Sequence, residues 1–235
     1  MIDTSKYWEQ LGSESIPDAD PVMGGSLRRS KVISGGSSFI EHVFTLPIQG
    51  RVLDASCGYG RHLLPFSKRL ESVGLDLSPS LLRRCKANLR KNGLKAELVR
   101  ANIRLLPFAE ATFGAVLCMS SLYYLEPRFW PSILSQFAHI LTKGGEFHTD
   151  VRMRKDVWTP HYGFGIFLII SRIVYELEKN SAFSWLWQKL GFRTLHGLHT
   201  FFTTERKFSK ILQAAGLHCM KIIPCQRPVF TCRKA

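Results

Sequence analysis

The sequence of 235 residues is poor in the features that mark secreted, zinc-binding and membrane-spanning proteins. Its six cysteines include no Cys-x-x-Cys pair, so neither a zinc site nor a disulfide scaffold is indicated. The N-terminal segment has no basic stretch followed by an apolar core, so we expect no secretory signal. The longest apolar run, Phe164 to Ile170, is far shorter than the ~20 residues that span a bilayer. These absences predict a soluble, cytoplasmic protein without a bound metal.

Acidic residues are scarce relative to basic ones. Lys and Arg number 32 against 18 Asp and Glu, which gives a formal net charge of +14. Such an excess attracts anionic partners, among them RNA, acidic lipid headgroups and phosphorylated metabolites. The basic residues are scattered in small groups, as on an ordinary solvated surface, and no separate RNA-binding appendage is visible. Nucleic acid is therefore not the partner that the sequence favours.

Strand-like and helix-like segments alternate from Arg51 onward, a pattern typical of an α/β fold with a mostly parallel sheet. One helix is expected to begin after Ser78, with Pro79 at its first position, and to end at Asn92 and Gly93. A late helix is expected to end at Gly216. The other expected elements are a helix over 131–141 and strands over 52–54, 72–76, 96–99, 113–119, 146–151, 219–224 and 228–232.

The length suits one domain, which we divide into four parts. Residues 1–50 are expected to form an N-terminal helical lid and residues 51–151 the core of the sheet. Residues 152–202 form an aromatic-rich helical insertion after the fifth strand, and residues 203–235 the last helix and a strand pair. Within the insertion, Phe164 to Leu177 is apolar on nearly every side of a helix and has to be covered by something.

The most informative stretch is RVLDASCGYGRH, residues 51–62. A short strand reaches Asp54, and a turn containing Gly58 and Gly60 opens the next helix. Unpaired backbone N–H groups and the positive end of the helix dipole then face one spot, which suits a carboxylate or phosphate of a nucleotide-like cofactor. A glycine pair alone is more often a simple tight turn. Asp76 strengthens the cofactor interpretation, because an acid at the end of the second strand can accept both ribose hydroxyl protons.

Two details argue against a dinucleotide. The third glycine of the dinucleotide fingerprint is missing, since Leu63 occupies that position. Asp54 precedes the glycines, where its charge would repel a pyrophosphate but attract an amino group.

This combination resembles the class I S-adenosylmethionine-dependent methyltransferases, in particular the small-molecule branch similar to methyltransferase type 11. The similarity rests on five segments in order, namely VLDASCGYGRH, GLDLSPSLL, RANIRLLPFAEATFGAVLCMSSLYYL, LTKGGEF and TTERKFSKILQAAGL. The resemblance implies a Rossmann-like fold with a mostly parallel seven-stranded sheet flanked by helices, and a helical cap insertion after strand five. It also implies S-adenosylmethionine as the cofactor and a small molecule as the methyl acceptor.

The resemblance assigns roles along the carboxyl edge of the sheet. The first acid and its glycines would hold the methionine moiety, the second acid the ribose, and the segment near Asn102 the adenine. The backbone of Cys118 to Ser120 would face the methionine end. Two departures from the family occur, since Asn102 replaces the usual Asp and Ser56 a usual Gly. Tyr7 and Trp8 are candidates for a lid. The residues that we expect to bind the cofactor are Tyr7, Trp8, Asp54, Ser56, Gly58, Gly60, Arg61, His62, Asp76, Leu77, Asn102, Ile103 and Cys118.

A methyltransferase needs to align the acceptor atom and, where required, remove a proton. The candidate catalytic residues are Tyr124, which follows the fourth strand, and His148 and Asp150 on the fifth. Other candidates are Tyr123 and the insertion histidines His161, His196 and His199. For each of them a hydrogen-bonded structural role remains an alternative.

The expected acceptor is a small hydrophobic or amphiphilic metabolite, methylated at O or N. The segment CMSSLYYL replaces the Asn/Asp-Pro-Pro-Tyr motif of enzymes that methylate base amines, and the aromatic insertion suits an apolar acceptor. Two alternatives stay open: an RNA methyltransferase, because of the charge of +14, and a non-catalytic cofactor-binding or membrane-surface protein, because of the apolar segment 164–177. Peripheral contact with a membrane is compatible with the expected enzyme as well.

Overall fold

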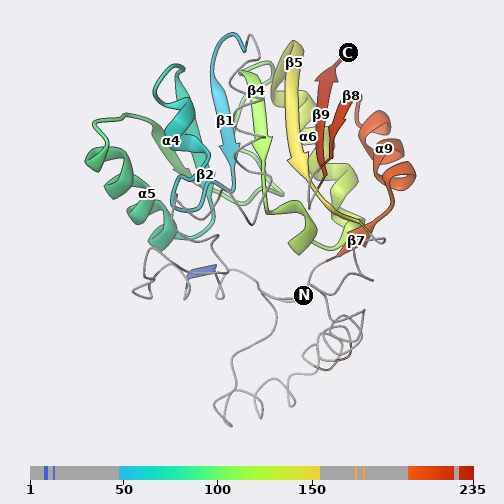
Figure 1. The fold of residues 1–235 in the computed structure, drawn as a ribbon, viewed down its shortest axis with the longest axis horizontal. Helices are drawn as coiled ribbons and strands as arrows, with labels where there is room; N and C mark the ends of the chain where they lie inside the picture. The colour runs from blue at the N-terminus through green and yellow to red at the C-terminus, as the bar shows by residue number, and fades with distance from the viewer. Residues whose placement is uncertain are drawn as a thin grey trace.

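The structure is a computed structural model that describes residues 48–153, 201–224 and 228–235, together with the single residues Trp8, Glu9, Ser13, Ile173 and Leu177. Its described part is built on one seven-stranded sheet with the strand order β3-β2-β1-β4-β5-β9-β8 (Figure 1). Neighbouring strands from β3 to β5 are parallel, and β9 is antiparallel to both β5 and β8. The strands are β1 (Val52–Ala55), β2 (Ser72–Asp76), β3 (Glu97–Arg100), β4 (Phe113–Cys118), β5 (Leu141–Asp150), β8 (Leu217–Ile223) and β9 (Val229–Lys234).

Helices connect β1 to β2, β2 to β3 and β4 to β5, while β3 leads to β4 through a loop, and the predicted Rossmann-like fold is confirmed. The described helices are α4 (Leu63–Phe66), α5 (Pro79–Lys91), α6 (Trp130–Ile140) and α9 (Glu205–Ala214), with 3-10 turns η1 (Leu122–Tyr124) and η2 (Pro127–Phe129). α6 packs against β5 and against α9, and α9 packs against β8. Figure 1 shows α4 and α5 at one end of the sheet and α9 at the other.

The local signals in the sequence explain where α5 begins and ends. Ser78 is its N-cap, with the side-chain oxygen accepting a hydrogen bond from the backbone N–H of Leu81, and Pro79 is its first residue. Arg90 and Lys91 lie in the last turn, where positive charge suits the helix dipole. The helix therefore starts directly behind Asp76, the last residue of β2.

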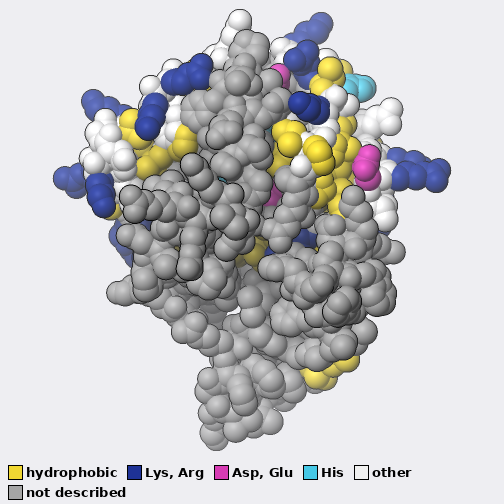
Figure 2. Space-filling model, viewed as in Figure 1, with side chains coloured by type: hydrophobic (Ala, Val, Ile, Leu, Met, Phe, Trp, Pro, Cys, Tyr) yellow, Lys and Arg dark blue, Asp and Glu magenta, His cyan; other side chains and the backbone are white. Residues whose placement is uncertain are grey.

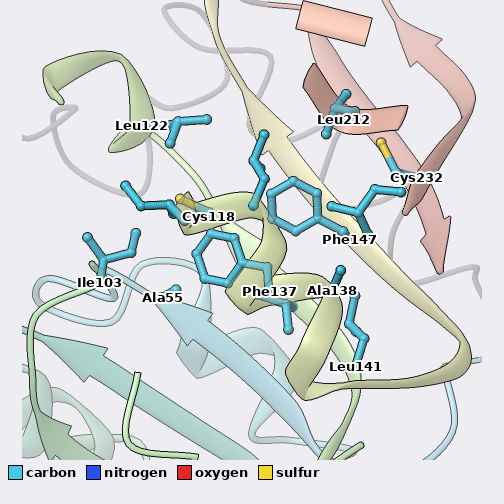
Figure 3. Close-up of a cluster of buried hydrophobic side chains, with 14 of the residues drawn as sticks. Ala55, Ile103, Cys118, Leu122, Phe137, Ala138, Leu141, Phe147, Leu212 and Cys232 are labelled. Atoms are coloured by element: carbon cyan, nitrogen blue, oxygen red, sulfur yellow. The ribbon is translucent and has the colours of Figure 1, made fainter. Parts of the chain in front are cut away.

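The largest hydrophobic core lies between the sheet and α6. Figure 3 shows Phe137 of α6 beside Phe147 of β5, and their rings stack with centroids 5.2 Å apart. All residues of β1 and β2 are buried, as is usual for parallel strands covered on both faces. This packing fixes the carboxyl ends of the central strands, where the candidate site lies.

The structure differs from the predicted elements in the start of β5, in the shortness of α4 and in one additional sheet. β5 begins at Leu141 rather than at Glu146, because Leu141 pairs with Phe113 directly after α6; a register irregularity follows before Ala115 pairs with Glu146. α4 has only four residues. A second, two-stranded parallel sheet of β6 (Arg152–Met153) and β7 (Phe202–Thr203) was not predicted, since two residues are too few to show a period.

The pairing of β6 with β7 brings the two ends of the insertion side by side. The backbone N–H of Phe201 also donates a hydrogen bond of 2.7 Å to the carbonyl of Tyr123, which ties the returning chain to η1. The predicted insertion helices and N-terminal lid lie outside the described residues, apart from the single positions named above. Ile173 and Leu177 are helical, and they are 54% and 44% exposed. None of the helices that the structure describes is long and apolar enough to cross a membrane.

Candidate functional site

Three buried carboxyl groups lie at the carboxyl ends of parallel strands. Asp54 is the third residue of β1, Asp76 the last of β2 and Asp150 the last of β5. Their exposed fractions are 1%, 8% and 2%. In doubly wound α/β sheets, ligands bind at this edge, where the connections leave in opposite directions. The switch falls between β1 and β4 here, because β1 leads to β2 on one side and β4 to β5 on the other.

The turn after β1 is held against β2. The backbone N–H groups of Ser56 and Cys57 both donate to the carbonyl of Leu75, at 2.7 and 2.9 Å. Ser56 has a positive φ of 70°, a conformation that favours glycine, so the Ser at this position strains the backbone as its departure from the family pattern predicts.

The two glycines of the turn serve different purposes. Gly60 has φ of 94°, and a Cβ there would lie 2.8 Å from Sγ of Cys85 and would clash with Leu64, so Gly60 is required by packing. Gly58 has φ of 55°, and a Cβ there would meet nothing within 4 Å among the described residues. Gly58 therefore borders open space in front of β1, where a cofactor could approach the backbone.

Asp76 is held by the backbone on both sides. Gly58 N–H donates to Oδ2 and Ser78 N–H to Oδ1, each at 2.9 Å. Burial raises the pKa of Asp76, while these two hydrogen bonds oppose the rise. A carboxylate oxygen can accept more than one hydrogen bond, so the predicted contact with ribose hydroxyls remains compatible with this arrangement.

Asp54 offers an unused acceptor. Its Oδ2 is buried and has no hydrogen-bond partner among the described residues. Burial first, and then the charge of Asp76, raise the pKa of Asp54 to about 7, while Arg61 opposes the rise. A buried, unsatisfied carboxylate oxygen is costly unless a donor meets it. The ammonium group of a methionine moiety would supply that donor, so the residues present fit the predicted cofactor.

The other side of β1 carries a second strained turn. Ser120, two residues after β4, has φ of 57°, and its backbone N–H donates to Oδ1 of Asp150 at 2.5 Å. A guanidinium nitrogen of Arg61 lies 3.4 Å from the hydroxyl oxygen of Ser120. Asp150 thus orients the turn that the sequence analysis places at the methionine end, and Arg61 brings a cation there.

The residues predicted to contact adenine differ in how far they are buried. Leu77 is half-buried, and Ile103 is 8% exposed and packs in the main core. Asn102 is exposed, and its side-chain carbonyl accepts a hydrogen bond of 2.9 Å from the backbone N–H of Arg104. This local turn orients the Asn amide while leaving a second lone pair of its oxygen available.

Two other predicted cofactor residues are buried. Cys118 is fully buried, and its carbonyl accepts a hydrogen bond of 2.7 Å from the hydroxyl of Thr149. His62 is 6% exposed. Tyr7 lies outside the described residues.

The catalytic candidates do not gather at one point. Tyr124 is half-buried at the carboxyl edge, and its ring lies 5.2 Å from that of Trp8 in an edge-to-face arrangement. His148 is fully buried, with Nδ1 3.2 Å from the hydroxyl of Thr231 and Nε2 3.3 Å from Glu146. This position corrects the expectation for His148, because both ring nitrogens face other side chains of the sheet instead of the edge.

The remaining candidates give little further support for a base. Tyr123 is fully buried, with the guanidinium of Arg152 4.9 Å from its ring centroid. His161, His196 and His199 lie outside the described residues.

Glu9 contacts the start of α5, a position that its sequence context does not predict. Its carboxylate accepts hydrogen bonds from Ser78 and Ser80 at the N-terminus of α5. The Ser-Pro-Ser sequence indicates the start of a helix, where backbone N–H groups lack intrahelical partners. Nothing in the local sequence indicates that an acid some seventy positions earlier is the partner of these groups.

Comparison with known proteins agrees with this geometry. Residues 52–145 match a family model described as a methyltransferase domain. This match and the order of the strands support the predicted class I S-adenosylmethionine-dependent methyltransferase. Its cofactor is accordingly expected to be S-adenosylmethionine, as the sequence predicted.

Individual relatives match the methyltransferase domain over part of their length. A phosphatidylethanolamine N-methyltransferase of Cereibacter sphaeroides is 33% identical over 100 residues, which cover 41% of this chain and 48% of that protein. An uncharacterized chloroplastic methyltransferase of Arabidopsis thaliana is 35% identical over 109 residues, covering 42% of this chain and 29% of that protein. The chain thus spans less than half the length of these curated relatives.

Solved structures share the fold. An S-adenosylmethionine-dependent methyltransferase from Clostridium acetobutylicum superposes with a TM-score of 0.61 at 16% identity, covering 89% of this chain and 95% of that one. One from Methanosarcina mazei gives a TM-score of 0.60 at 16% identity, covering 83% and 96%. At this identity the likeness concerns the fold of the methyltransferase domain alone.

Proposed function

We propose that the protein transfers the methyl group of S-adenosylmethionine to an O or N atom of a small hydrophobic or amphiphilic molecule. The proposal is carried by the buried Oδ2 of Asp54, which has no hydrogen-bond partner among the described residues, together with the glycine turn at Gly58, where no described residue would meet an added Cβ, in a segment that matches a methyltransferase domain. The carboxylate of Asp54 would accommodate the ammonium group of an amino acid, and Gly58 would let the cofactor approach the backbone closely.

The side chains around this spot suit a methionine moiety in zwitterionic form. Asp54 would receive the ammonium group, and Arg61, at the methionine end beside Ser120, would receive the carboxylate. Asp76 would receive the ribose hydroxyls, its carboxylate being oriented by Gly58 and Ser78. The cofactor, when bound, supplies an already activated methyl group, so these residues have to position it and exclude water rather than activate it.

A nitrogen acceptor fits the described residues better than an oxygen acceptor. An alcohol requires a base near the methyl group, but His148 is enclosed by Thr231 and Glu146, and the carboxylate of Asp150 accepts a hydrogen bond from the Ser120 N–H. A neutral amine needs no prior deprotonation and acquires positive charge as it is methylated. The aromatic pair of Trp8 and Tyr124 at the edge would favour such a cation. The similarity to a phosphatidylethanolamine N-methyltransferase points the same way.

The RNA alternative receives no support from the face of the molecule that Figure 2 shows. On the face shown in Figure 2, Lys and Arg side chains are spread around the described part of the molecule and are not gathered into one patch. A continuous basic surface is the usual footprint of nucleic-acid binding.

Two measurements test the proposal. Thermal melting with S-adenosylmethionine, S-adenosylhomocysteine, NAD and ATP should show stabilisation by the first two alone, by about 2.7 kcal/mol at a hundredfold excess over Kd. Transfer of labelled methyl groups to fractionated lipid, metabolite and RNA extracts should then place the label in a lipid or metabolite amine. Label in RNA that falls steeply with added salt would favour the alternative, and no stabilisation by either adenosyl compound would refute the proposal.

A further inference from the structure

Glu9 is bound to the N-terminus of α5 through several contacts. Its Oε2 accepts hydrogen bonds from the hydroxyl of Ser78 at 2.7 Å and from the backbone N–H of Ser80 at 3.1 Å. Its Oε1 accepts from the hydroxyl of Ser80 and lies 3.7 Å from a guanidinium nitrogen of Arg83. A helix of 13 residues presents free N–H groups and partial positive charge at this end, both of which suit a carboxylate.

The contact is held at every physiological pH. The hydroxyls of Ser80 and then Ser78 lower the pKa of Glu9 to about 2, so its carboxylate is ionised throughout the neutral range. Ser78 also connects Glu9 to the proposed ribose acid, since its backbone N–H donates to Asp76 while its hydroxyl donates to Glu9.

The neighbouring residue, Trp8, reaches the opposite side of β1. Its ring contacts Tyr124 in η1, which follows β4, with a centroid distance of 5.2 Å and an interplanar angle of 80°. Glu9, in contrast, contacts α5, which follows β2. In the sheet order, β1 lies between β2 and β4.

These two contacts determine where the chain runs. Consecutive Cα atoms are about 3.8 Å apart, whereas strands on either side of a third are separated by roughly 9.6 Å. The side chains of two adjacent residues can reach both sides when their backbone lies near the end of the strand between them. Residues 8 and 9 therefore lie near the carboxyl end of the sheet, between the segments that follow β2 and β4. Figure 1 shows this short blue segment on the side of the sheet toward which β1 and β2 point.

We propose that Glu9 is a latch that holds Trp8 over the cofactor site, so that the cofactor leaves only after Glu9 detaches from α5. This inference rests on the proposed function, because it assumes that an adenosyl cofactor lies beneath residues 8 and 9. Glu9 acts as a positioning residue, since its own carboxylate is occupied by Ser78 and Ser80 and contacts neither the methyl group nor the acceptor. The latch controls cofactor residence time, and Trp8 is the part that covers the site.

The test compares Glu9→Ala and Glu9→Gln with Glu205→Ala in the full-length protein. Glu205 is also an acid at the first turn of a helix, but on α9, and therefore serves as the matched control. Affinity for S-adenosylhomocysteine is measured by calorimetry and its dissociation rate by stopped flow. We expect Glu9→Ala to weaken binding and to accelerate dissociation by about tenfold each, with Glu9→Gln intermediate and Glu205→Ala within twofold of wild type.

A second measurement separates latching from simple stabilisation. Hydrogen exchange of a peptide containing residues 8 and 9 should slow when S-adenosylhomocysteine binds to wild type, and this protection should be lost in Glu9→Ala although the protection of β1 and β4 is kept. Binding, release and exchange in Glu9→Ala that match Glu205→Ala would overturn the latch and leave the proposed function intact. Failure of wild type to bind S-adenosylhomocysteine at all would overturn the proposed function and the latch with it.

Discussion

The backbone N–H of Gly58 donates a hydrogen bond of 2.9 Å to Oδ2 of Asp76. This bond joins the glycine turn after β1 to the acid that ends β2, and it explains why both belong to one site although they are 18 positions apart. Asp76 therefore shapes the turn in addition to its proposed contact with the ribose. The turn cannot keep its conformation independently of the acid, which makes the two glycines good probes of the site.

Gly60→Ala should mainly lower the stability of the fold, whereas Gly58→Ala should mainly abolish cofactor binding. At Gly60 the positive φ costs about 1–2 kcal/mol and the contact with Cys85 and Leu64 about 1–3 kcal/mol more, so the fold itself should be destabilised. At Gly58 the added methyl meets open space, so stability should fall only by the cost of φ, while binding of S-adenosylhomocysteine is lost. Urea denaturation and calorimetry measure the two effects. Equal losses of stability in both variants would contradict these separate roles.

Asp54 should make the cofactor-free protein less stable as the pH rises. Its pKa is 3.8 in the unfolded chain and about 7 in the fold, raised by burial first and then by Asp76. Below pH 4 both states are protonated; between pH 4 and 7 the unfolded state ionises first, so stability falls across this window and is constant above it. The full difference is at most roughly 4 kcal/mol at about 1.36 kcal/mol per pH unit.

Asp54→Asn isolates this effect, because every other titrating group stays in place. We expect the variant to be more stable than wild type at pH 8 and similar at pH 4, while its affinity for S-adenosylhomocysteine falls at least tenfold. Urea denaturation across the pH range gives the difference between the two proteins. A difference that does not change with pH would show that Asp54 titrates normally in the fold.

The local sequence predicted the strand ends and the helix start that form this site. It did not predict the side-chain contacts between residues far apart in the sequence. The start of α5 followed from Ser78 and Pro79, because capping involves only neighbouring residues. The acids at the ends of β1 and β2 followed from the alternation of strands and helices. The partner of Ser80 is Glu9, 71 positions away, and that of His148 is Thr231, 83 positions away. Periodicity and capping carry no information about such pairs.

Ser56→Gly should stabilise the protein. Ser56 has φ of 70°, which costs a non-glycine residue roughly 1–2 kcal/mol, whereas a glycine costs about 0.5–1 kcal/mol in the entropy of the unfolded chain. The expected net gain is about 0.5–1 kcal/mol in denaturant unfolding. Ser121, with φ of −133°, provides the control, since Ser121→Gly relieves no strain and should lower stability. A loss of stability in Ser56→Gly would mean that the Ser hydroxyl contributes more than the strain.

We expect His148 to stabilise the fold and to take no part in catalysis. Its imidazole is fully buried between Thr231 and Glu146, and its hydrogen bond is the largest influence lowering the pKa of Glu146. His148→Ala leaves a cavity and unpaired polar groups, so we expect a loss of about 2–4 kcal/mol in the free energy of unfolding. The kcat of the folded fraction, measured with the acceptor found by labelled methyl transfer, should stay within twofold of wild type.

Asp150→Ala is the contrasting variant, because it removes the acceptor for the Ser120 N–H and frees the turn at the methionine end. Its kcat/KM should fall by tenfold or more, since the turn that positions the cofactor loses its anchor. Asp150→Asn retains an oxygen that can accept this hydrogen bond and should recover most of the activity if the carboxyl group positions the turn. A carboxylate that removes a proton from the acceptor would not be replaced by Asn, so equal losses in Asp150→Asn and Asp150→Ala would identify Asp150 as the base.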